Sequence, residues 1–569
     1  MHKSEYKKQQ ILKLGFLIAS LVLISVVSNH LFLRLDLTSD KRYTLSPVTR
    51  EVLDNLDDIV YIRIYLDGDL PVGFRRLQNS VREMIDEFRV ASRRTIHYEF
   101  IDPAGIDDNA LRDDLFQQLY DKGLRPTNIE IAERGGGRSQ KLAFPGALIS
   151  YKGMEMPVNF LKNNPALPAD ENLNNSIQSV EYELISTIHA LKNPETKKVA
   201  FLEGHGELDE MLVAGISEAI ARYYDIYRGR IDEQDLQSLD DYHALIIAKP
   251  VRPFAEAEKY IIDQYIMNGG SVMWLIDPVS IDLDSLTYAS EAVALINDVN
   301  LDDQLFRYGV RLNPNLVMDM NCLLIPINVA LAEEQARFAP APWYFSPLLS
   351  GNDAHPVTRG INYVKAEFAS VIDTVGSDPL VTREVLLRTS QETRVLNAPL
   401  MVSLDISRTH QDPRDFNSPR QPVAMLLEGA FPSVFANRAV SAIIGRDDPR
   451  FRERGENTRM IVVADGDIIR NDVTVSQGAP EPLPLGYDRY SGQTFGNREF
   501  ILNSLNYLMD DSGLMELRTR ELQLRLLDRA RVRAELTMWQ VINLTLPLAL
   551  VLFFGLLYNG LRKRRFASR

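Results

Sequence analysis

The sequence has few of the residues that mark reactive or disulfide-stabilised proteins. Among its 569 residues there is one cysteine, Cys322, and there are eight histidines. A single cysteine excludes an intramolecular disulfide and any Cys-x-x-Cys redox or zinc site. It leaves the compartment open, because proteins outside the cytoplasm also exist without disulfides.

Positive charge is scarce in the middle of the chain and concentrated at its two ends. The formal net charge is −14, while residues 1–13 carry +3 and residues 559–569 carry +5, so the remaining residues carry −22. A nucleic-acid-binding domain needs a basic face. The acidic middle therefore predicts that nucleic acid is not a partner.

Two long apolar runs are present, one beside each basic end. Residues 14–33 contain no acidic or basic side chain except His30, and residues 538–558 contain none. Each run has the roughly 20 residues that a helix needs to cross a hydrocarbon core. Trp539 and Tyr558 lie where an aromatic belt would fall. The sequence therefore predicts two transmembrane helices.

Two other interpretations of these runs are less favoured. The first run could be a cleaved signal peptide, but Val26-x-Ser28 is a poor cleavage site and the run continues beyond it. The second could be a buried core helix, but its length and the basic residues 562–565 that stop it favour a span. The positive-inside rule places the basic ends, 1–13 and 559–569, in the cytoplasm. We therefore expect a bacterial inner-membrane protein with both termini cytoplasmic and a large periplasmic body.

The body is predicted to contain two α/β domains, divided near Pro194. The first, residues 34–192, has strands at 59–65, 95–100, 127–133, 141–151 and 154–160 and helices at 75–92 and 109–123. This order, in which two helices alternate with the first three strands, resembles a thioredoxin-like unit, and without Cys-x-x-Cys it is expected to be a scaffold. A glycine triplet at 135–137 predicts a hairpin turn, because no Gly-Lys-Ser/Thr or helix follows it.

The second domain, residues 197–513, begins with strands that alternate with helices. Strands at 199–202, 243–248 and 271–276, with helices ending near 224 and 267, predict a parallel, doubly wound sheet. Further elements are added beyond residue 305. We expect strands at 316–318, 384–388, 400–405 and 459–464, loops at 340–356, 408–422 and 433–458, and a helix at 497–509.

Residues 514–537 form a leucine-rich segment with six arginines, directly before the second apolar run. One interpretation is a solvated stalk whose leucine face is packed. The other is an amphipathic juxtamembrane helix that lies on lipid headgroups.

The turn after the first strand of the second domain is the strongest candidate site. The strand at 199–202 ends in Glu203-Gly204-His205-Gly206-Glu207, and a helical pattern follows. Open α/β sheets bind ligands just beyond the carboxyl ends of their strands. The candidate ligand-binding set comprises these five turn residues and four aspartates at other strand ends, Asp277, Asp319, Asp465 and Asp467.

Catalysis by this set is the less favoured role. Glu203, His205 and Glu207 could act as general acid and base. However, the turn lacks the serine of a Gly-x-Ser-x-Gly hydrolase, and no second histidine lies within helical reach to bind zinc. Asp465 and Asp467 alone are weak evidence for a calcium site. We therefore predict no catalytic residue, no metal and no cofactor.

A structural role and a binding role both remain open for the turn. Glycines allow a tight turn, and acids can accept hydrogen bonds from backbone amides near a helix N-terminus. Residues 199–221 contain no lysine or arginine, which disfavours an anionic ligand. A cationic, sugar-like or protein ligand is expected instead.

Several blocks together resemble one family. They are LDLTSDKRYTLS (35–46), FLEGHGE (201–207), KYIIDQYIMNGGSVMWLIDP (259–278), LLEGAFPSVFANR (426–438), VVADGDIIRNDV (462–473) and GNREFILNSLNYLMDDSGLMELR (496–518). The chain resembles the GldG family, the gliding-motility-associated ABC transporter components of Bacteroidetes, over almost its whole length. The resemblance implies a GldA-like ABC ATPase and a GldF-like permease as partners, and an auxiliary or substrate-binding role. It implies no catalytic residues.

Two functions follow as hypotheses. The first is a non-catalytic periplasmic subunit of an ABC transporter, which docks to the permease and recognises a substrate or partner. The second is a membrane-anchored enzyme that acts on envelope glycan or peptide through Glu203, His205 and Glu207.

Overall fold

The computed structural model describes most of the chain, in three stretches. They are residues 13–18 with 20, residues 44–519, and residues 529–566. Short gaps lie at 107, 133–137, 163–167, 194–196, 282–285, 287, 289–290, 329–334, 336, 377, 445–447 and 477. The predicted glycine turn at 135–137 and most of the predicted first span, residues 14–33, lie outside the described residues.

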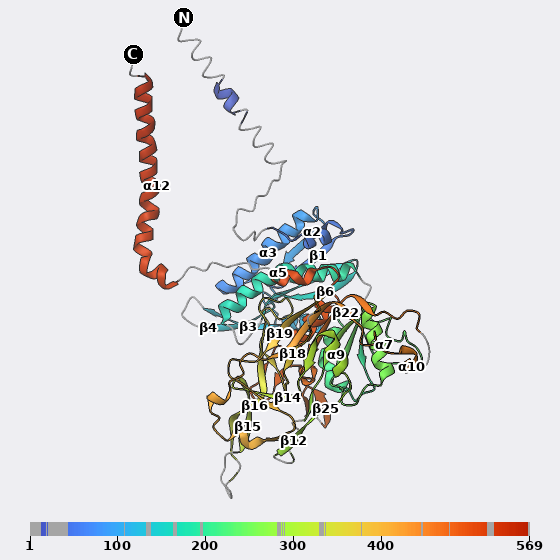
Figure 1. The fold of residues 1–569 in the computed structure, drawn as a ribbon. Helices are drawn as coiled ribbons and strands as arrows, with labels where there is room; N and C mark the ends of the chain where they lie inside the picture. Colours follow the sequence, from blue (N-terminus) through green and yellow to red (C-terminus); the bar gives the residue numbers. More distant parts are fainter. Residues whose placement is uncertain are drawn as a thin grey trace. The chain divides into compact units, whose positions relative to one another are not determined.

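The N-terminal part of the body is built on a four-stranded sheet with the order β2-β1-β5-β6. Strand β1 pairs in parallel with β2 and antiparallel with β5, and β3 and β4 form a separate hairpin. The elements are α2 (Pro47–Asp54), β1 (Val60–Ile64), α3 (Val72–Ala91), β2 (Ile96–Phe100), α4 (Asn109–Asp121), β3 (Thr127–Ala132), β4 (Arg138–Ala143), β5 (Gly146–Tyr151), β6 (Met154–Asn159) and α5 (Ala169–Lys192). Helices α3 and α5 lie side by side (Figure 1).

One strand of this sheet differs from the prediction. The single strand expected at 141–151 is two strands, because the chain leaves β4 at Ala143 and starts β5 at Gly146. Pro145 lies between them and has no N–H to donate to a ladder. β4 pairs with β3, whereas β5 joins the main sheet beside β1.

The larger part of the body is organised by a ten-stranded sheet. Its parallel half has the order β8-β7-β9-β10-β23, and antiparallel strands β22, β19, β16 and β15 extend it. The strands are β7 (Lys198–Leu202), β8 (Asp225–Gly229), β9 (Ala244–Ala248), β10 (Ser271–Leu275), β15 (Cys322–Asn328), β16 (Phe338–Gly351), β19 (Val381–Arg388), β22 (Pro422–Pro432), β23 (Arg454–Val463) and the short β17 (Val364–Lys365), which pairs with β16.

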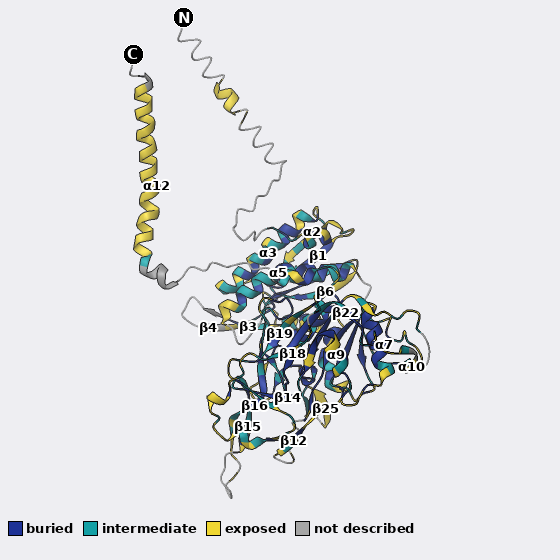
Figure 2. Ribbon diagram, in the orientation of Figure 1, coloured by how far each residue is buried: buried dark blue, intermediate teal, exposed yellow. Residues whose placement is uncertain are grey.

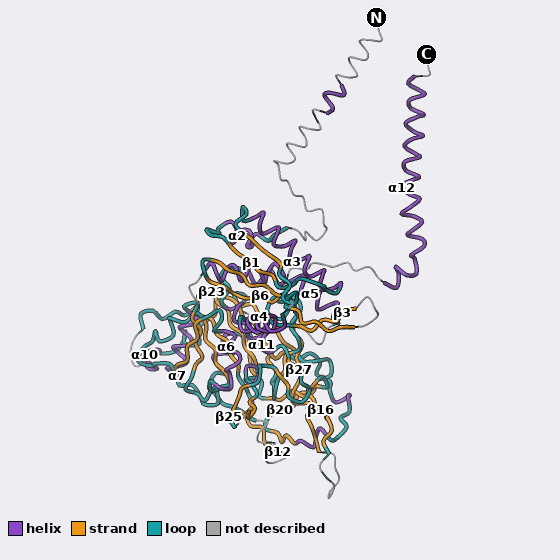
Figure 3. Tube along the Cα trace, turned by 180° about the vertical axis from the view of Figure 1, so that it is seen from behind, coloured by secondary structure: helices purple, strands orange, loops and turns teal. Residues whose placement is uncertain are grey.

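Helices cover both faces of the parallel half. Along β7, Val199 and Phe201 enter one core, and Ala200 and Leu202 enter the other, because successive strand residues point to opposite faces. Helices α6 (Ala214–Ile220) and α11 (Asn497–Leu508) cover the first core, and α7 (Glu256–Met267) and α9 (Asp302–Tyr308) cover the second. Figure 3 shows α6 and α11 from behind, and Figure 1 shows α7 and α9 on the other side.

Shorter strands complete this part of the body. They include β11 (Val279–Ser280), β12 (Glu291–Ile296) and β21 (Leu400–Ser403), which form one sheet, and the pair β14 (Asn315–Asp319) and β20 (Thr393–Asn397). Other described elements are β13 (Val310–Leu312), β18 (Ile372–Thr374), α10 (Val440–Ile444), β24 (Val473–Ser476), β25 (Ala479–Pro482), β26 (Tyr487–Asp488) and β27 (Gln493–Thr494).

Two predicted loops of the second domain are wrong in part. Most of the loop expected at 340–356 is the long strand β16, which tolerates Pro340 and Pro342 because over residues 338–343 it pairs with β15 alone. The loop expected at 433–458 contains α10 and the first residues of β23. The first residues of β23, which include Arg454 and Glu456, are largely exposed to solvent. They therefore lack the alternation of apolar and polar residues that identifies a strand in a sequence.

Residues 514–537, expected to be either a stalk with a packed leucine face or an amphipathic helix on lipid, are described only in part, because 520–528 lie outside the described residues. Residues Leu514–Thr519 form a 3₁₀ segment, η5, whose leucines pack into the core of the N-terminal part instead of onto lipid. Helix α12 (Arg529–Phe566) is continuous from residue 529. Within the described residues, its segment Glu535–Arg564 is the one helix that is long and apolar enough to cross a membrane, with a mean hydropathy of 2.2 over an 18-residue window. Figure 2 shows it exposed along its length.

Candidate functional site

The turn after β7 is organised around a buried histidine. His205 is 4% exposed, and its Nδ1 and Nε2 lie 3.0 Å from carboxylate oxygens of Glu207 and Glu258, respectively. The ring stacks on Phe254, with 3.5 Å between ring centroids and 14° between planes. Both ring nitrogens are therefore engaged, which leaves no free nitrogen for substrate or metal.

These contacts favour the charged form of the ring. Burial by itself lowers the pKa of His205, but the hydrogen bonds and charges of Glu207 and Glu258 outweigh it, so the pKa is raised above its ordinary value. Glu258 also accepts from the backbone N–H of Ala255 at 2.8 Å, at the start of α7. One carboxylate thus links the turn to that helix.

The turn itself is closed against the loop that follows β9. The carbonyl of His205 accepts hydrogen bonds from the N–H groups of Val251 and Arg252, at 2.8 and 2.9 Å. Gly206 has φ +78, and an added Cβ would lie 2.5 Å from Val251 Cγ2. In a doubly wound sheet this place, between β7 and β9, is the switch point where ligands usually bind. Here the two loops fill it.

Two expectations about this turn are wrong. No helix begins at Glu207, because a 3₁₀ turn starts only at Met211 and α6 at Ala214, so the acids do not cap a helix N-terminus. The turn is also not free of cations. Arg228 of β8 donates from Nε to Glu203 at 2.8 Å. The absence of lysine and arginine from residues 199–221 therefore does not disfavour an anionic ligand, because the fold brings an arginine to the turn.

Three of the four predicted aspartates come together one strand further along. Asp277 follows β10, and Asp465 and Asp467 follow β23, so all three lie at the carboxyl ends of neighbouring parallel strands. Carboxylate oxygens of the three lie within 4.8 Å of one another. Lys249, which follows β9, places its Nζ 3.1 Å from Asp277 and 2.5 Å from Asp467.

The lysine supplies the positive charge that a metal ion would otherwise bring to this cluster. Burial lowers the pKa of Lys249, but Asp277 and Asp467 outweigh it, so the pKa is raised. Burial raises the pKa of Asp465 well above its ordinary value, and the neighbouring Asp277 and Asp467 raise it further. Lys249 was absent from the predicted set. Its position directly after the apolar run at 244–248 is the sequence signal that could have identified it.

Asp319 belongs to neither group. Its carboxylate accepts from Ser390 N at 2.7 Å, Ser390 Oγ at 2.6 Å, Thr393 Oγ1 at 3.0 Å and Asn321 N at 2.7 Å. It is 0% exposed. The Asp319 carboxylate therefore has a structural role, because its hydrogen bonds hold the turn at residues 389–393 in place.

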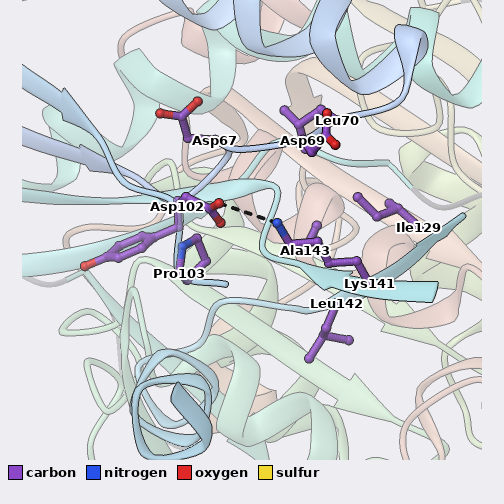
Figure 4. Close-up of a pocket in the computed structure, with 10 residues that line it drawn as sticks. Asp67, Asp69, Leu70, Asp102, Pro103, Ile129, Lys141, Leu142 and Ala143 are labelled. Atoms are coloured by element: carbon purple, nitrogen blue, oxygen red, sulfur yellow. Dashed lines mark hydrogen bonds and ion pairs between the residues drawn. The ribbon is translucent and has the colours of Figure 1, made fainter. Parts of the chain in front are cut away.

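The N-terminal part contains a small acidic pocket (Figure 4). Asp67 and Asp69 line it from the loop after β1, and Asp102 lines it from the loop after β2. Asp102 pairs with Lys141 at 3.4 Å, and Gln78 donates to Asp67 at 2.7 Å. The sequence analysis missed this pocket, although carboxylates after two neighbouring parallel strands are a signal for it.

Comparison with known proteins gives two family matches. A family described as ABC-type uncharacterized transport system matches residues 196–504, and a domain of unknown function matches residues 39–150. An uncharacterized protein of Borreliella burgdorferi is 21% identical over 574 residues, which cover 98% of this chain and 99% of that protein.

Two solved structures have limited similarity. The mmIFT52 N-terminal domain is 12% identical with a TM-score of 0.31, over 55% of this chain and 99% of that chain. A ThuA-like protein from Parabacteroides merdae is 11% identical with a TM-score of 0.26, over 55% of this chain and 90% of that chain.

Proposed function

The chain belongs to the family described as ABC-type uncharacterized transport system, and from this we propose that it is the non-catalytic accessory subunit of an ABC transporter. The observation that carries the proposal is the combination of the family domain with the apolar helix at Glu535–Arg564. A membrane-associated chain of a transport-system family has the transporter's other components as its natural partners. We propose that these are an ABC ATPase, GldA-like, and a permease, GldF-like.

We further propose a GldG-like role, linked to gliding motility. In this arrangement residues 14–33 and 538–558 both cross the inner membrane, both termini lie in the cytoplasm and the body lies in the periplasm. The six sequence blocks and the basic ends support it. The β2-β1-β5-β6 sheet, with α3 and α5 side by side, supports a thioredoxin-like assignment for the N-terminal part.

Contacts of residues 509–518 support the proposal that the two parts of the body dock to the permease together. Tyr182 of α5 donates its hydroxyl to Met515 Sδ at 3.0 Å, and the Arg518 guanidinium lies 5.6 Å from the Tyr182 ring centroid. Lys197 donates to the Met509 carbonyl at 2.7 Å. Residues 509–518 thereby contact both α5 of the N-terminal part and the first residues of the larger part.

For the turn after β7 we propose a structural role for His205 and Glu207 and a recognition role for its exposed residues. The Glu203 side chain is 40% exposed, and Gly204 and Gly206 are exposed. These groups can contact a substrate or partner without disturbing the buried histidine. The buried aspartates have no such access, since Asp465 is 0% exposed.

Co-purification tests the accessory role. The full chain, extracted in mild detergent, should bring an ABC ATPase and a permease with it, and recovery of the chain alone would contradict the proposal. The enzyme alternative is tested with Glu203→Gln, which removes the more exposed of the two turn acids. Unchanged transport and assembly, matched to the exposed control Glu210→Gln, would reject an acid-base role at this turn.

A further inference from the structure

The outer side of the turn after β7 is uncovered. Gly204 and Gly206 are both exposed, and within the described residues neither glycine N–H donates a hydrogen bond. The inner side of the same turn is closed, because the His205 ring is buried and the loop after β9 bonds to its carbonyl. A ligand therefore reaches the main chain of this turn from the outside.

Two arginines flank the exposed glycines, one from each neighbouring strand. β7 lies between β8 and β9, so the residues that follow those two strands lie on either side of the turn. Arg230 follows β8, and a Cβ added to Gly204 would lie 3.8 Å from its Cγ. Arg252 follows β9, and a Cβ added to Gly206 would lie 3.7 Å from its Nε.

Both guanidinium groups are available to a ligand. Arg230 and Arg252 are exposed, and neither side chain has a hydrogen bond or an ion pair with any residue that the structure describes. A third arginine near the turn, Arg228, is different, because it is paired with Glu203 at 2.8 Å. A guanidinium presents planar, paired N–H donors that match the oxygens of a carboxylate or a phosphate.

The acids at the turn are already engaged. Glu203 is paired with Arg228, and Glu207 contacts the buried His205 ring at 3.0 Å. Glu258 contacts the other nitrogen of that ring, also at 3.0 Å. These acids therefore do not neutralise the two flanking arginines, and an anion on the outer side of the turn meets positive groups that have no other partner.

The turn is supported rigidly from beneath. The His205 ring stacks on Phe254, with 3.5 Å between ring centroids. The His205 carbonyl accepts from the N–H groups of Val251 and Arg252, and the second of these bonds fixes the main chain of Arg252 beside the turn. A preorganised site loses little conformational entropy when it binds a ligand.

We infer that the outer side of this turn binds a phosphoryl group, between the two flanking guanidiniums and over the exposed glycines. Free N–H groups of a glycine turn bind the oxygens of anions, as in phosphate-binding loops. Two guanidiniums match the double negative charge of a phosphate better than the single charge of a carboxylate. The inference rests on the recognition role proposed above for the exposed residues of the turn, and it names the chemistry that they recognise.

Inorganic phosphate is the probe for this site. The full-length chain in mild detergent is titrated with phosphate at constant ionic strength, and calorimetry gives the dissociation constant. Arg230→Gln and Arg252→Gln should each weaken phosphate binding about tenfold or more, the loss expected when one charged hydrogen-bond donor is removed. Arg311→Gln is the matched control, because Arg311 is exposed on β13 outside the turn, and it should leave the dissociation constant unchanged.

Unfolding without phosphate separates lost binding from lost folding. Both flanking arginines are exposed and unpaired, so each variant should unfold at the same denaturant concentration as the wild type. A wild type that does not bind phosphate would overturn the inference. Equal phosphate binding by the wild type and both turn variants would also overturn it.

Two further titrations identify the source of the phosphoryl group. Glycerol phosphate represents a soluble ester, and phosphatidylglycerol in mixed detergent micelles represents a lipid headgroup. Tighter binding of one of them that depends on Arg252 supports the site and assigns its ligand. Phosphate binding by a chain that brings no ATPase or permease with it would contradict the accessory role alone. Co-purification without phosphate binding would contradict this inference alone.

Discussion

Replacing His205 with alanine should lower the free energy of unfolding of the larger part by about 3–5 kcal/mol, as expected when one partner of a buried ion pair is removed. The histidine is 4% exposed and contacts carboxylates of Glu207 and Glu258 at 3.0 Å each. The Glu207 side chain, 2% exposed, would stay buried without its cation. The lost stacking on Phe254 falls within the same range.

The same histidine makes stability depend on pH in a defined direction. Its pKa is raised in the folded protein, so the folded state binds the proton more tightly than the unfolded chain does. The stabilisation that His205 contributes is therefore complete below the ordinary histidine pKa of about 6.5. It is lost as the pH rises through the pKa of His205 in the folded protein. The wild type should lose stability across that window, and His205→Ala should lack this dependence.

Denaturant unfolding of the full chain in detergent measures both effects, with the buried Trp274 and Trp343 as fluorescent reporters. His97→Ala is the matched control, because His97 is exposed on β2 and its loss should cost within about 0.5 kcal/mol. Equal stabilities for the two variants would refute the reasoning. So would a wild type whose stability rises with pH through the window.

Three further substitutions test the other buried contacts. Lys249→Met should destabilise by about 3–5 kcal/mol at neutral pH and by less at acidic pH, because protonation of Asp277, whose pKa burial raises, removes the charge left without Lys249; unfolding at both pH values measures this. Leu514→Ala should cost about 2–3 kcal/mol, because this side chain is 6% exposed in the core of the N-terminal part, and equal unfolding midpoints would contradict its packing. Gly206→Ala should destabilise through its positive φ and the contact with Val251, and a more stable variant would exclude that strain.

Local patterns predicted much of the fold. The alternation of apolar residues in β1 and the continuous apolar runs of β9 and β10 identify strands because burial fixes the pattern. β16 was missed because prolines normally exclude a strand, and its pairing with β15 depends on a partner outside the segment. The edge strand β8 was missed because it alternates exposed and half-buried residues and has little apolar character.

Only those residues of the candidate site that directly follow a predicted strand could be identified from the sequence. The turn residues and Asp277 were recognised because they directly follow strands. Glu258 lies 53 residues from His205 along the chain, and only the fold brings its carboxylate to the ring. The same holds for Lys249 and Asp467, which are 218 residues apart. Contacts between residues this far apart along the chain have no characteristic spacing, so a single sequence does not predict them.

These two clusters have a common organisation that bears on function. Each lies at the carboxyl ends of the parallel strands, where α/β proteins leave a crevice for a ligand. Each already contains its own basic group, the His205 ring between two glutamates and the Lys249 ammonium between two aspartates. A ligand that entered either cluster would have to displace a buried, paired charge, at a cost of several kcal/mol. The arrangement therefore favours the proposed recognition on the outer surface of the body, through side chains such as Glu203, over binding inside the sheet edge.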